Sequence, residues 1–419
     1  MEIKINDNIL LHYIPMEKLK TTTLSLSIHR QLCEDDASKN ALIPYVLKRG
    51  CKLCPNLGEI SKYLENLYGA NLGAGVSKMG EDQVLGFYLE SISDRYAPEK
   101  EPLLSDLTAL MLSVVFEPVT ENGGFSEEFV NQERNNLKDR IDALVNDKRS
   151  YAMYRCAQEM CQGEPFRIYK LGTKEALDEI EPKSLYNYYQ TMISSSKIDI
   201  YVCGDTDIEK VEEKIREYVQ HIDFVQADYP KTQLFKQDTQ VKTVEESMDV
   251  TQGKLSLGFR TSILPTDEDY FALVVANSIL GGGAHSKLFN NVREKLSLAY
   301  YASSQLEKYK GLMLVNAGIE FDKFQAAYDE ILAQLKELQD GEISDLEYES
   351  SIQAIINALQ SYYDDQRYME SYYLGEQIAG TSRSIEEYQE KIKAVTKVQA
   401  ADAAKKIKLD TVYFLKGDR

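Results

Sequence analysis

Apolar and polar residues alternate along several short segments of this chain, and each such segment predicts a half-buried β-strand. In LSLSIHR at 24–30 every second residue is apolar, and KLSLGF at 254–259 repeats the pattern. Two further segments, VLGFYLESI at 84–92 and GLMLVNAGI at 311–319, predict a strand pair in each half of the chain. Both halves are therefore expected to begin with a β-sheet.

Helical periodicity is found in both halves as well. ALIPYVLK at 41–48 predicts a first helix, and DYFALVVANSIL at 269–280 predicts its counterpart in the second half. Longer amphipathic patterns at 126–147 and 344–366 repeat their apolar positions at helical spacing. Helices thus dominate the later part of each half.

Short sequence echoes recur in the same order in the two halves. LSLSIHR reappears as LSLGFR at 255–260, and LYGANLGAGV at 67–76 precedes AYYASSQLEK at 299–308 by 232 residues. Each half also closes with a strand that runs into Gly-Asp, at 204–205 and at 417–418. Their common order indicates an internal duplication.

The expected fold class is α+β, with two homologous domains that each pack a mostly antiparallel sheet against helices. We place the N-terminal domain at 1–224, a linker at 225–244 and the C-terminal domain at 245–419. The linker is polar and contains Tyr-Pro, which is typical of a boundary segment.

Composition and charge narrow the classes of function. The chain has 419 residues and a net charge of −19, which disfavours binding to nucleic acid or to an anionic membrane. Its apolar runs are shorter than a membrane span, and its start lacks the pattern of a signal peptide. A cytoplasmic protein is the expectation.

The six cysteines suggest reduced thiols rather than a disulfide framework. Cys51 and Cys54 form a lone CxxC, whereas a zinc knuckle needs a second pair, and Cys156 and Cys161 are poorly spaced for one. Inert thiols are the expected state, and metal binding through Cys51 and Cys54 is the alternative.

A glycine run at Gly281–Gly283 raises the question of a nucleotide site. It follows an apolar helix and matches neither GxxxxGK[ST] nor GxGxxG, so a phosphate-binding loop is not expected. The glycines instead permit a helix to end and two backbones to approach closely.

The stretch LGGGAHSKLFNNVREKLSLAYYASS at 280–304 resembles the C-terminal signature of insulinase/pitrilysin-like metallopeptidases, a family that includes mitochondrial processing peptidase. The resemblance covers nearly the whole chain, including LYGANLGAG and KSLYNYYQTMISSSKIDIYVCGD at 183–205. Arg293 and Tyr300 match the arginine–tyrosine pair of that family. The resemblance implies that they bind the peptide and stabilise the oxyanion, a task that suits fixed donors.

The zinc motif of that family, His-x-x-Glu-His, is absent. Ala41, Pro44 and Tyr45 occupy its positions, and Arg140 stands where the further zinc-binding Glu is expected. None of these side chains is a zinc ligand at neutral pH. Glu133 and Asp139 are close enough that a shifted alignment restores one carboxylate, but one carboxylate is not a zinc site.

These observations lead to one hypothesis and two alternatives. The chain is expected to bind no metal and to supply Arg293 and Tyr300 in trans to a homologous subunit that carries zinc. In isolation it is expected to form a homodimer. An extended peptide is the expected substrate, with Gly69, Gly73 and Gly75 near the edge strand that receives it.

The alternatives are a purely structural subunit and a stand-alone peptidase with atypical metal ligands. A narrower resemblance is to bacterial proteins associated with aminopentanol modification of elongation factor P.

Overall fold

The structure is a computed structural model that describes residues 1–98, 102–235 and 240–418. The chain divides into two compact units. The first unit comprises Met1–Asp142, Ile168–Lys231 and Tyr363–Ile378, and the second comprises Ala143–Arg167, Thr232–Tyr362 and Ala379–Arg419. The chain changes unit at five points, and one of them, between Lys231 and Thr232, lies inside the predicted linker 225–244. Residues 236–239 of that segment lie outside the described part.

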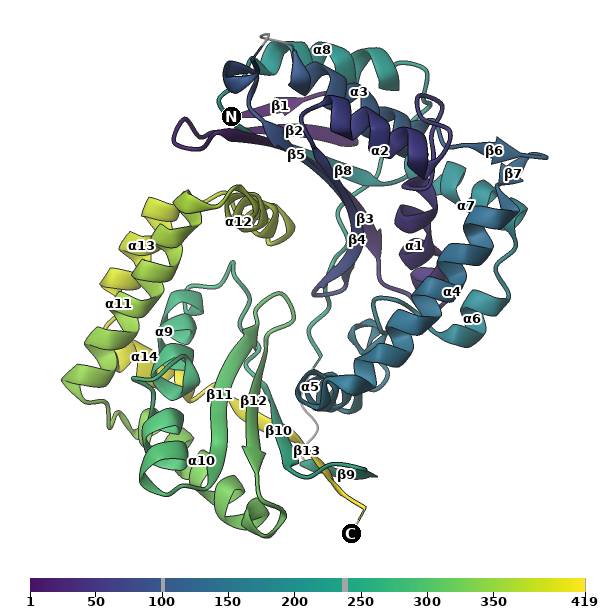
Figure 1. Cartoon of the computed structure of the whole chain (residues 1–419). Helices are drawn as coiled ribbons and strands as arrows, with labels where there is room; N and C mark the ends of the chain where they lie inside the picture. The colour runs from purple at the N-terminus through teal and green to yellow at the C-terminus, as the bar shows by residue number, and fades with distance from the viewer. Residues whose placement is uncertain (99–101, 236–239, 419) are drawn as a thin grey trace. The chain divides into compact units, whose positions relative to one another are not determined.

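A six-stranded sheet forms the centre of the first unit, in the order β1-β2-β8-β3-β5-β4 (Figure 1). Its pairs are antiparallel except β2 with β8. The strands are β1 (Glu2–Lys4), β2 (Ile9–Pro15), β3 (Thr21–Gln31), β4 (Asn71–Met79), β5 (Asp82–Ile92) and β8 (Lys197–Gly204). A short hairpin of β6 (Thr120–Glu121) and β7 (Gly124–Phe125) stands apart from it.

The second unit contains a five-stranded sheet in the order β11-β12-β10-β13-β9. Here too a single pair, β9 with β13, is parallel. The strands are β9 (Lys242–Met248), β10 (Gly253–Arg260), β11 (Ala299–Glu307), β12 (Leu312–Ile319) and β13 (Lys408–Gly417). Read from the other end, this order matches β2-β8-β3-β5-β4 strand for strand and in the sense of each pairing. The predicted α+β fold with two homologous sheets is confirmed.

Helices cover the apolar face of the first sheet. Leu24, Leu26 and Ile28 of β3 are fully buried on this face. The helices of this side, seen together in Figure 1, include α1 (Glu34–Leu47), α2 (Leu57–Asn66), α3 (Leu103–Phe116), α7 (Pro182–Ser194) and α8 (Ile208–Val219). The long helix α4 (Glu127–Ala143) and the short α6 (Lys174–Asp178) complete this unit's N-terminal part. The buried apolar residues form one continuous core.

Each unit also includes one helix from the other half of the sequence. Helix α12 (Gln366–Ile378) belongs to the first unit and contacts β8, while α5 (Lys148–Met160) belongs to the second and contacts β10 and β13. Both follow a long helix and a short 3₁₀ turn, so they occupy equivalent places in the duplicated order. Cys156 and Met160 of α5 leave no room for a side chain at Gly258, where a Cβ would lie 2.8 Å from the Met160 sulfur.

The remaining helices of the second unit are α9 (Tyr270–Gly281), α10 (Phe324–Asp340), α11 (Asp345–Ser361), α13 (Ile385–Ala394) and α14 (Lys397–Ala404). The expected close approach at the glycine run is confirmed, because a Cβ on Gly281 would lie 2.4 Å from the Ser304 backbone nitrogen of β11. Helices α11, α13 and α14 all begin with a capping box, which explains why their starts are sharply defined.

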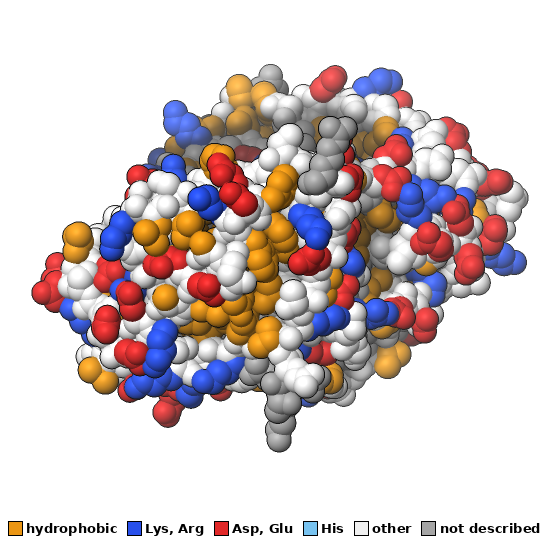
Figure 2. All heavy atoms as spheres, turned by 90° about the horizontal axis from the view of Figure 1, so that it is seen from below, with side chains coloured by type: hydrophobic (Ala, Val, Ile, Leu, Met, Phe, Trp, Pro, Cys, Tyr) orange, Lys and Arg blue, Asp and Glu red, His pale blue; other side chains and the backbone are white. Residues whose placement is uncertain are grey.

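On the face drawn in Figure 2, basic and acidic side chains are interspersed rather than gathered by sign. The large negative charge of the chain is therefore spread over this face. Among the helices of the described residues, none is long and apolar enough to cross a membrane.

Candidate functional site: a degenerate metal position and an exposed arginine–tyrosine pair

The positions that correspond to the lost zinc motif lie on α1 and α4 of the first unit. Ala41 and Pro44 are buried in the core, where they contribute only packing. Tyr45 is half-buried, and the Arg140 guanidinium carbon lies 4.1 Å from its ring centroid. The fold thus brings together residues that are 95 positions apart, and it joins them by a cation–π contact.

Further cations and their partners surround this contact. Arg49 Nε lies 2.5 Å from Glu133 Oε1, so one of the two carboxylates that a shifted alignment offers already has a partner. Burial lowers the pKa of Lys48, and the Arg140 charge lowers it further. The residues present do not fit a zinc ion, since cations stand where anionic or imidazole ligands are required. No cluster of three or more His, Cys, Asp or Glu side chains suited to a metal occurs within the described ranges.

Replacing Arg140 by Glu tests whether a carboxylate at this position is enough to restore zinc binding. The change restores the carboxylate of the family but leaves Ala41, Pro44 and Tyr45 without an imidazole. We expect negligible bound zinc, measured by elemental mass spectrometry after incubation with zinc and gel filtration. Loss of the cation–π contact should lower the free energy of unfolding by about 0.5–1 kcal/mol. Stoichiometric zinc in this variant would contradict the conclusion that the remaining residues cannot hold a zinc ion. Arg140→Lys serves as the charge-conserving control.

The predicted substrate-binding glycines divide into two kinds. Gly69 has a positive φ of 74° and its N–H donates to the Leu64 carbonyl, so it ends α2 in a left-handed turn. Gly73 and Gly75 lie in β4, the edge strand of the first sheet. A Cβ on Gly75 would lie 3.8 Å from the Tyr45 hydroxyl oxygen. The edge strand and the degenerate metal position are therefore neighbours, as a peptide site at this edge requires.

Arg293 and Tyr300 are both exposed, and both belong to the second unit. Arg293 lies in a π-helical turn, η4 (Leu288–Lys295), with its side chain 42% exposed and its Nε 3.4 Å from Glu294 Oε1. Tyr300 is 60% exposed and donates to Glu320 Oε1 over 3.3 Å. Neither side chain is needed to fill a core, and the π-turn packs directly against β11.

Local backbone geometry sets the direction of Tyr300. The pairing of β11 with β12 shifts register between Ala299 and Tyr301, so Tyr300 is the extra residue of a β-bulge. Ser297 just before it has a φ of 50°, an uncommon conformation for a residue with a side chain. Bulges and π-turns commonly re-aim side chains at functional sites. The resemblance to the metallopeptidase signature pointed to both residues, but it could not predict this geometry.

Sequence reasoning missed a buried ionic chain on the polar face of the first sheet. His12 Nε2 lies 2.7 Å from Asp199 Oδ1, and His29 Nε2 lies 3.0 Å from Asp199 Oδ2. His29 Nδ1 lies 2.6 Å from Asp82 Oδ2, while the Tyr229 hydroxyl donates to Asp199 over 2.9 Å. The side chains of His29 and Asp199 are 0% exposed. Four strands, β2, β8, β3 and β5, thus contribute to one network.

This network keeps His29 protonated and Asp199 ionised, although burial alone would favour the neutral form of both side chains. Burial opposes protonation of His29, yet the two neighbouring carboxylates raise its pKa to about 9. Burial also opposes ionisation of Asp199, but hydrogen bonds from His12 and His29 lower its pKa to about 2. The alternation Thr-Leu-Ser-Leu-Ser-Ile-His in β3 was the available signal, because it places His29 on the polar face.

The paired cysteines belong to the buried core of the first unit. Cys51 and Cys54 are buried, and the Cys51 N–H donates to the Cys54 carbonyl over 2.8 Å. Burial raises the pKa of the Cys54 thiol to about 11, whereas a thiol that binds metal must lose its proton.

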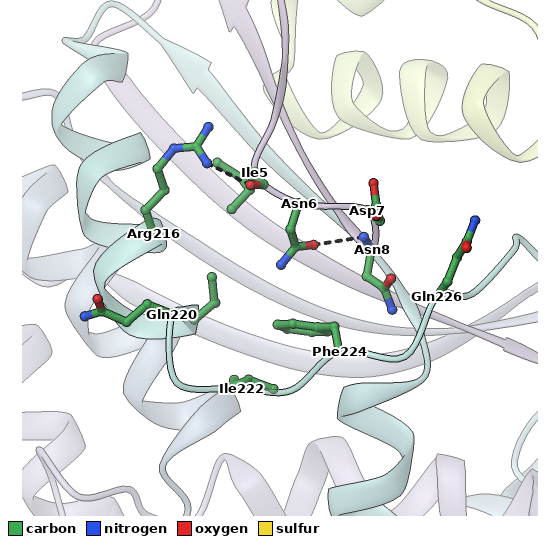
Figure 3. A pocket seen from close by; sticks show the side chains of 10 residues that line it. Ile5, Asn6, Asp7, Asn8, Arg216, Gln220, Ile222, Phe224 and Gln226 are labelled. Carbon is green, nitrogen blue, oxygen red and sulfur yellow. Dashed lines mark hydrogen bonds between the residues drawn. The ribbon is translucent and has the colours of Figure 1, made fainter.

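A cavity of about 530 Å³ lies beside the β1–β2 turn and α8 (Figure 3). Its polar groups mostly bond to the turn itself. Arg216 donates to the Ile5 carbonyl over 2.7 Å, and Asn6 Oδ1 accepts from the Asn8 N–H over 2.8 Å. These bonds hold the turn against the helix, so the cavity has a structural explanation.

Two homologous α+β units with a degenerate metal position define a metallopeptidase-like protein, and comparisons with known proteins identify its family. A family model described as "Peptidase M16 inactive domain" matches residues 179–355. The chain is 37% identical over 410 residues to the "Probable inactive metalloprotease YmfF" of Bacillus subtilis (strain 168), covering 97% of this chain and 95% of that protein. It is 25% identical over 312 residues to the "Uncharacterized zinc protease YmxG" of the same bacterium, covering 71% and 72%.

Solved structures agree with this result. A conserved protein from Enterococcus faecalis V583 has a TM-score of 0.90 at 30% identity, covering 100% of this chain and 98% of that one. The peptidase M16 inactive domain from Pseudomonas fluorescens has a TM-score of 0.82 at 16% identity, with the same coverage. The chain belongs to the peptidase M16 family and is a homologue of its inactive metalloproteases. None of these descriptions mentions elongation factor P, so that narrower resemblance stays a prediction.

Proposed function

We propose that this chain is the non-catalytic subunit of a cytoplasmic, two-subunit zinc peptidase. Two observations together support this proposal. The metal position of the first unit is filled by a Tyr45–Arg140 contact, while Arg293 and Tyr300 of the second unit are exposed. A protein that served only as a scaffold would have no need to keep this pair in solvent. Bacillus subtilis has both an inactive-type and a zinc-type relative of this chain, which supports pairing between such proteins.

In this proposal the two exposed side chains act on the peptide at the partner's active site. Zinc in the partner would supply the activated water for hydrolysis. The Arg293 guanidinium offers a fixed fork of donors, and the Tyr300 hydroxyl offers a further neutral donor. Both stabilise negative charge as it develops on the carbonyl oxygen. The Glu294 and Glu320 contacts, at 3.4 and 3.3 Å, are long enough to be exchanged for substrate.

The β4 edge provides a second surface for the same substrate. An edge strand presents unpaired backbone N–H and C=O groups, and an extended peptide satisfies them by adding a strand. Gly73 and Gly75 leave the peptide unobstructed by side chains. Such binding recognises backbone rather than sequence, which suits an enzyme that accepts extended peptides.

The first test compares the chain alone with a mixture. We expect the purified chain to contain negligible zinc and to leave a fluorogenic peptide library intact. After mixing with a zinc-bearing homologue of the YmxG type from the same organism, we expect co-elution on gel filtration and chelator-sensitive cleavage above that of the homologue alone. Stoichiometric zinc in the isolated chain, with cleavage, would favour the stand-alone peptidase instead.

Serine replacements of Cys51 and Cys54 separate the atypical-metal alternative from the proposed function. Because both thiols are buried in the core of the first unit, the double variant should retain the metal content and the partner-dependent cleavage of the unaltered chain. Metal content is measured by elemental mass spectrometry and cleavage by initial rates. A parallel loss of metal and cleavage in the double variant would assign a metal site to the CxxC pair, provided that its thermal unfolding is unchanged.

A further inference from the structure

A second cavity, of about 480 Å³, lies between α12 and the polar face of the first sheet. All of its lining residues belong to the first unit. Small residues leave this part of the face open: Gly75 pairs with Gly86, which in turn pairs with Ser27. In the neighbouring row, Tyr88 pairs with Ser25, which pairs with Tyr201. The sheet therefore provides a polar floor with aromatic rings at one end.

Glu370 of α12 points its carboxyl group at this floor. The residue is only 6% exposed, and its carboxylate accepts hydrogen bonds from the hydroxyl groups of Thr23 and Ser25. No basic side chain lies within ion-pair distance of Glu370 in the described part of the chain. Burial raises its pKa to about 7, because the hydroxyl groups only partly replace water around the charged form.

A buried hydroxyl group lines the same cavity without a hydrogen-bond partner. Tyr201 is 1% exposed, and its hydroxyl oxygen has no partner among the described residues. Ser25, whose hydroxyl group donates to Glu370, is the cross-strand neighbour of Tyr201, so both groups lie over the same part of the sheet. Buried polar groups are rarely left unpaired, so this hydroxyl calls for an explanation.

The charged groups around the cavity leave one carboxyl group without a counter-ion. Arg367 lies over the Tyr88 ring at 4.6 Å and pairs with Glu90 at 3.0 Å, so its charge is already compensated. This contact also demonstrates that a guanidinium group fits against this aromatic lining. Arg367 also acts electrostatically on Glu370, but no ion pair joins Glu370 to a basic side chain among the described residues.

We propose that this cavity binds an ammonium or guanidinium group, with Glu370 as its counter-ion and the Tyr201 hydroxyl as a hydrogen-bond acceptor. Such a ligand satisfies both groups at once, since it brings several N–H donors and a positive charge. The inference deepens the proposed function, because Gly73 and Gly75 of the proposed peptide edge also line this cavity. Binding nevertheless requires neither the partner subunit nor Arg293 and Tyr300, so it can be tested on the isolated chain.

Binding should release protons near neutral pH. Free Glu370 is partly protonated there, and a bound cation favours the carboxylate, so each protonated molecule gives its proton to the buffer. Glu90 and Arg367 remain paired with each other and stay charged throughout. A calorimetric titration in two buffers of different ionisation enthalpy measures this release directly.

The experiment titrates the full chain with agmatine, with a short peptide that contains arginine, and with the same peptide containing neutral citrulline. We expect saturable binding of a guanidinium compound, no binding of the citrulline peptide, and proton release at pH 7. Glu370→Gln keeps the shape and the hydroxyl contacts, and it should weaken binding about tenfold or more and abolish the proton release. Glu209→Gln, an exposed carboxylate of α8, is the matched control and should bind normally.

Tyr201→Phe provides a second variant that should fold normally, because it removes a hydroxyl group that has no partner among the described residues. It should bind several-fold more weakly while its thermal stability is unchanged or higher. Binding of the arginine peptide alone would identify a peptide side chain as the source of the cation, and binding of agmatine alone a free amine. Equal affinity for citrulline and arginine, unaltered binding by Glu370→Gln, or no saturable binding of either cation would overturn the proposal.

Discussion

Replacing Arg293 by alanine should lower the partner-dependent rate of peptide cleavage about 10²–10³-fold, the range found when one donor to a developing oxyanion is removed. The side chain is 42% exposed, so its loss should affect neither folding nor assembly. Tyr300→Phe removes only a hydroxyl group and should have a smaller effect in the same direction. Initial rates at saturating peptide, with assembly monitored by gel filtration, provide the measurement.

Two control variants lie next to these residues. Lys295→Ala removes another exposed cation from the same π-helical turn, and Tyr301→Phe removes the next hydroxyl of β11. Both should retain the full rate. If the Arg293 variant assembles and cleaves as the unaltered chain does, the purely structural subunit becomes the better description. A defect in assembly alone would point to a role at the interface instead.

The second large effect is expected at Asp199, where an Asn replacement should lower the free energy of unfolding by about 3–5 kcal/mol. The carboxylate is fully buried and lies within 3.0 Å of both His12 and His29. Its loss leaves a buried histidine charge with only Asp82 beside it, and the amide cannot accept from all the former donors. Urea unfolding at pH 6 measures the change. Asp223→Asn, an exposed carboxylate of the same unit, should change stability by less than about 0.5 kcal/mol.

The same network predicts how stability depends on pH. The folded-state pKa of His29, about 9, lies above its ordinary value of 6.5, so its contribution is complete below pH 6.5 and is lost as the pH rises through 9. The pKa of Asp199, about 2, lies below its ordinary value of 3.8, so its contribution is present above about pH 4 and is lost as the pH falls through 2. The two groups together should give their greatest stabilisation between about pH 4 and 6.5.

His29→Gln should remove the alkaline part of this profile, whereas His221→Gln, which alters an exposed side chain, should leave it intact. Free energies of unfolding at pH 6 and pH 9.5 give the comparison. An unaltered chain that is equally stable at both pH values would show that His29 is neutral in the folded state, and it would remove the basis of the predicted alkaline loss.

Much of the fold could be predicted from sequence because it depends on local chemistry. The alternation of apolar and polar residues in β3 and β10 determines which side chains share a face of the sheet. The strands and their apolar face can therefore be predicted from this two-residue period. The loss of the zinc motif can also be recognised from the sequence, since the side chains of Ala41 and Pro44 have no atom that can bind zinc wherever they lie. The resemblance to the family signature pointed to Arg293 and Tyr300, although the bulge that turns Tyr300 outward depends on the register of β11 against β12.

The sequence by itself determined the duplicated α+β architecture, the absence of the zinc motif and the candidate arginine–tyrosine pair. Only the tertiary structure decided which distant polar groups meet. Asp199 joins His12 across 187 positions, and Glu370 reaches Thr23 across 347. Such contacts depend on strand order, register and the placement of α12, and a shift of one residue would turn every side chain of a strand to the opposite face. Periodicity predicts a polar face, but the energetics of long-range pairing select its partners.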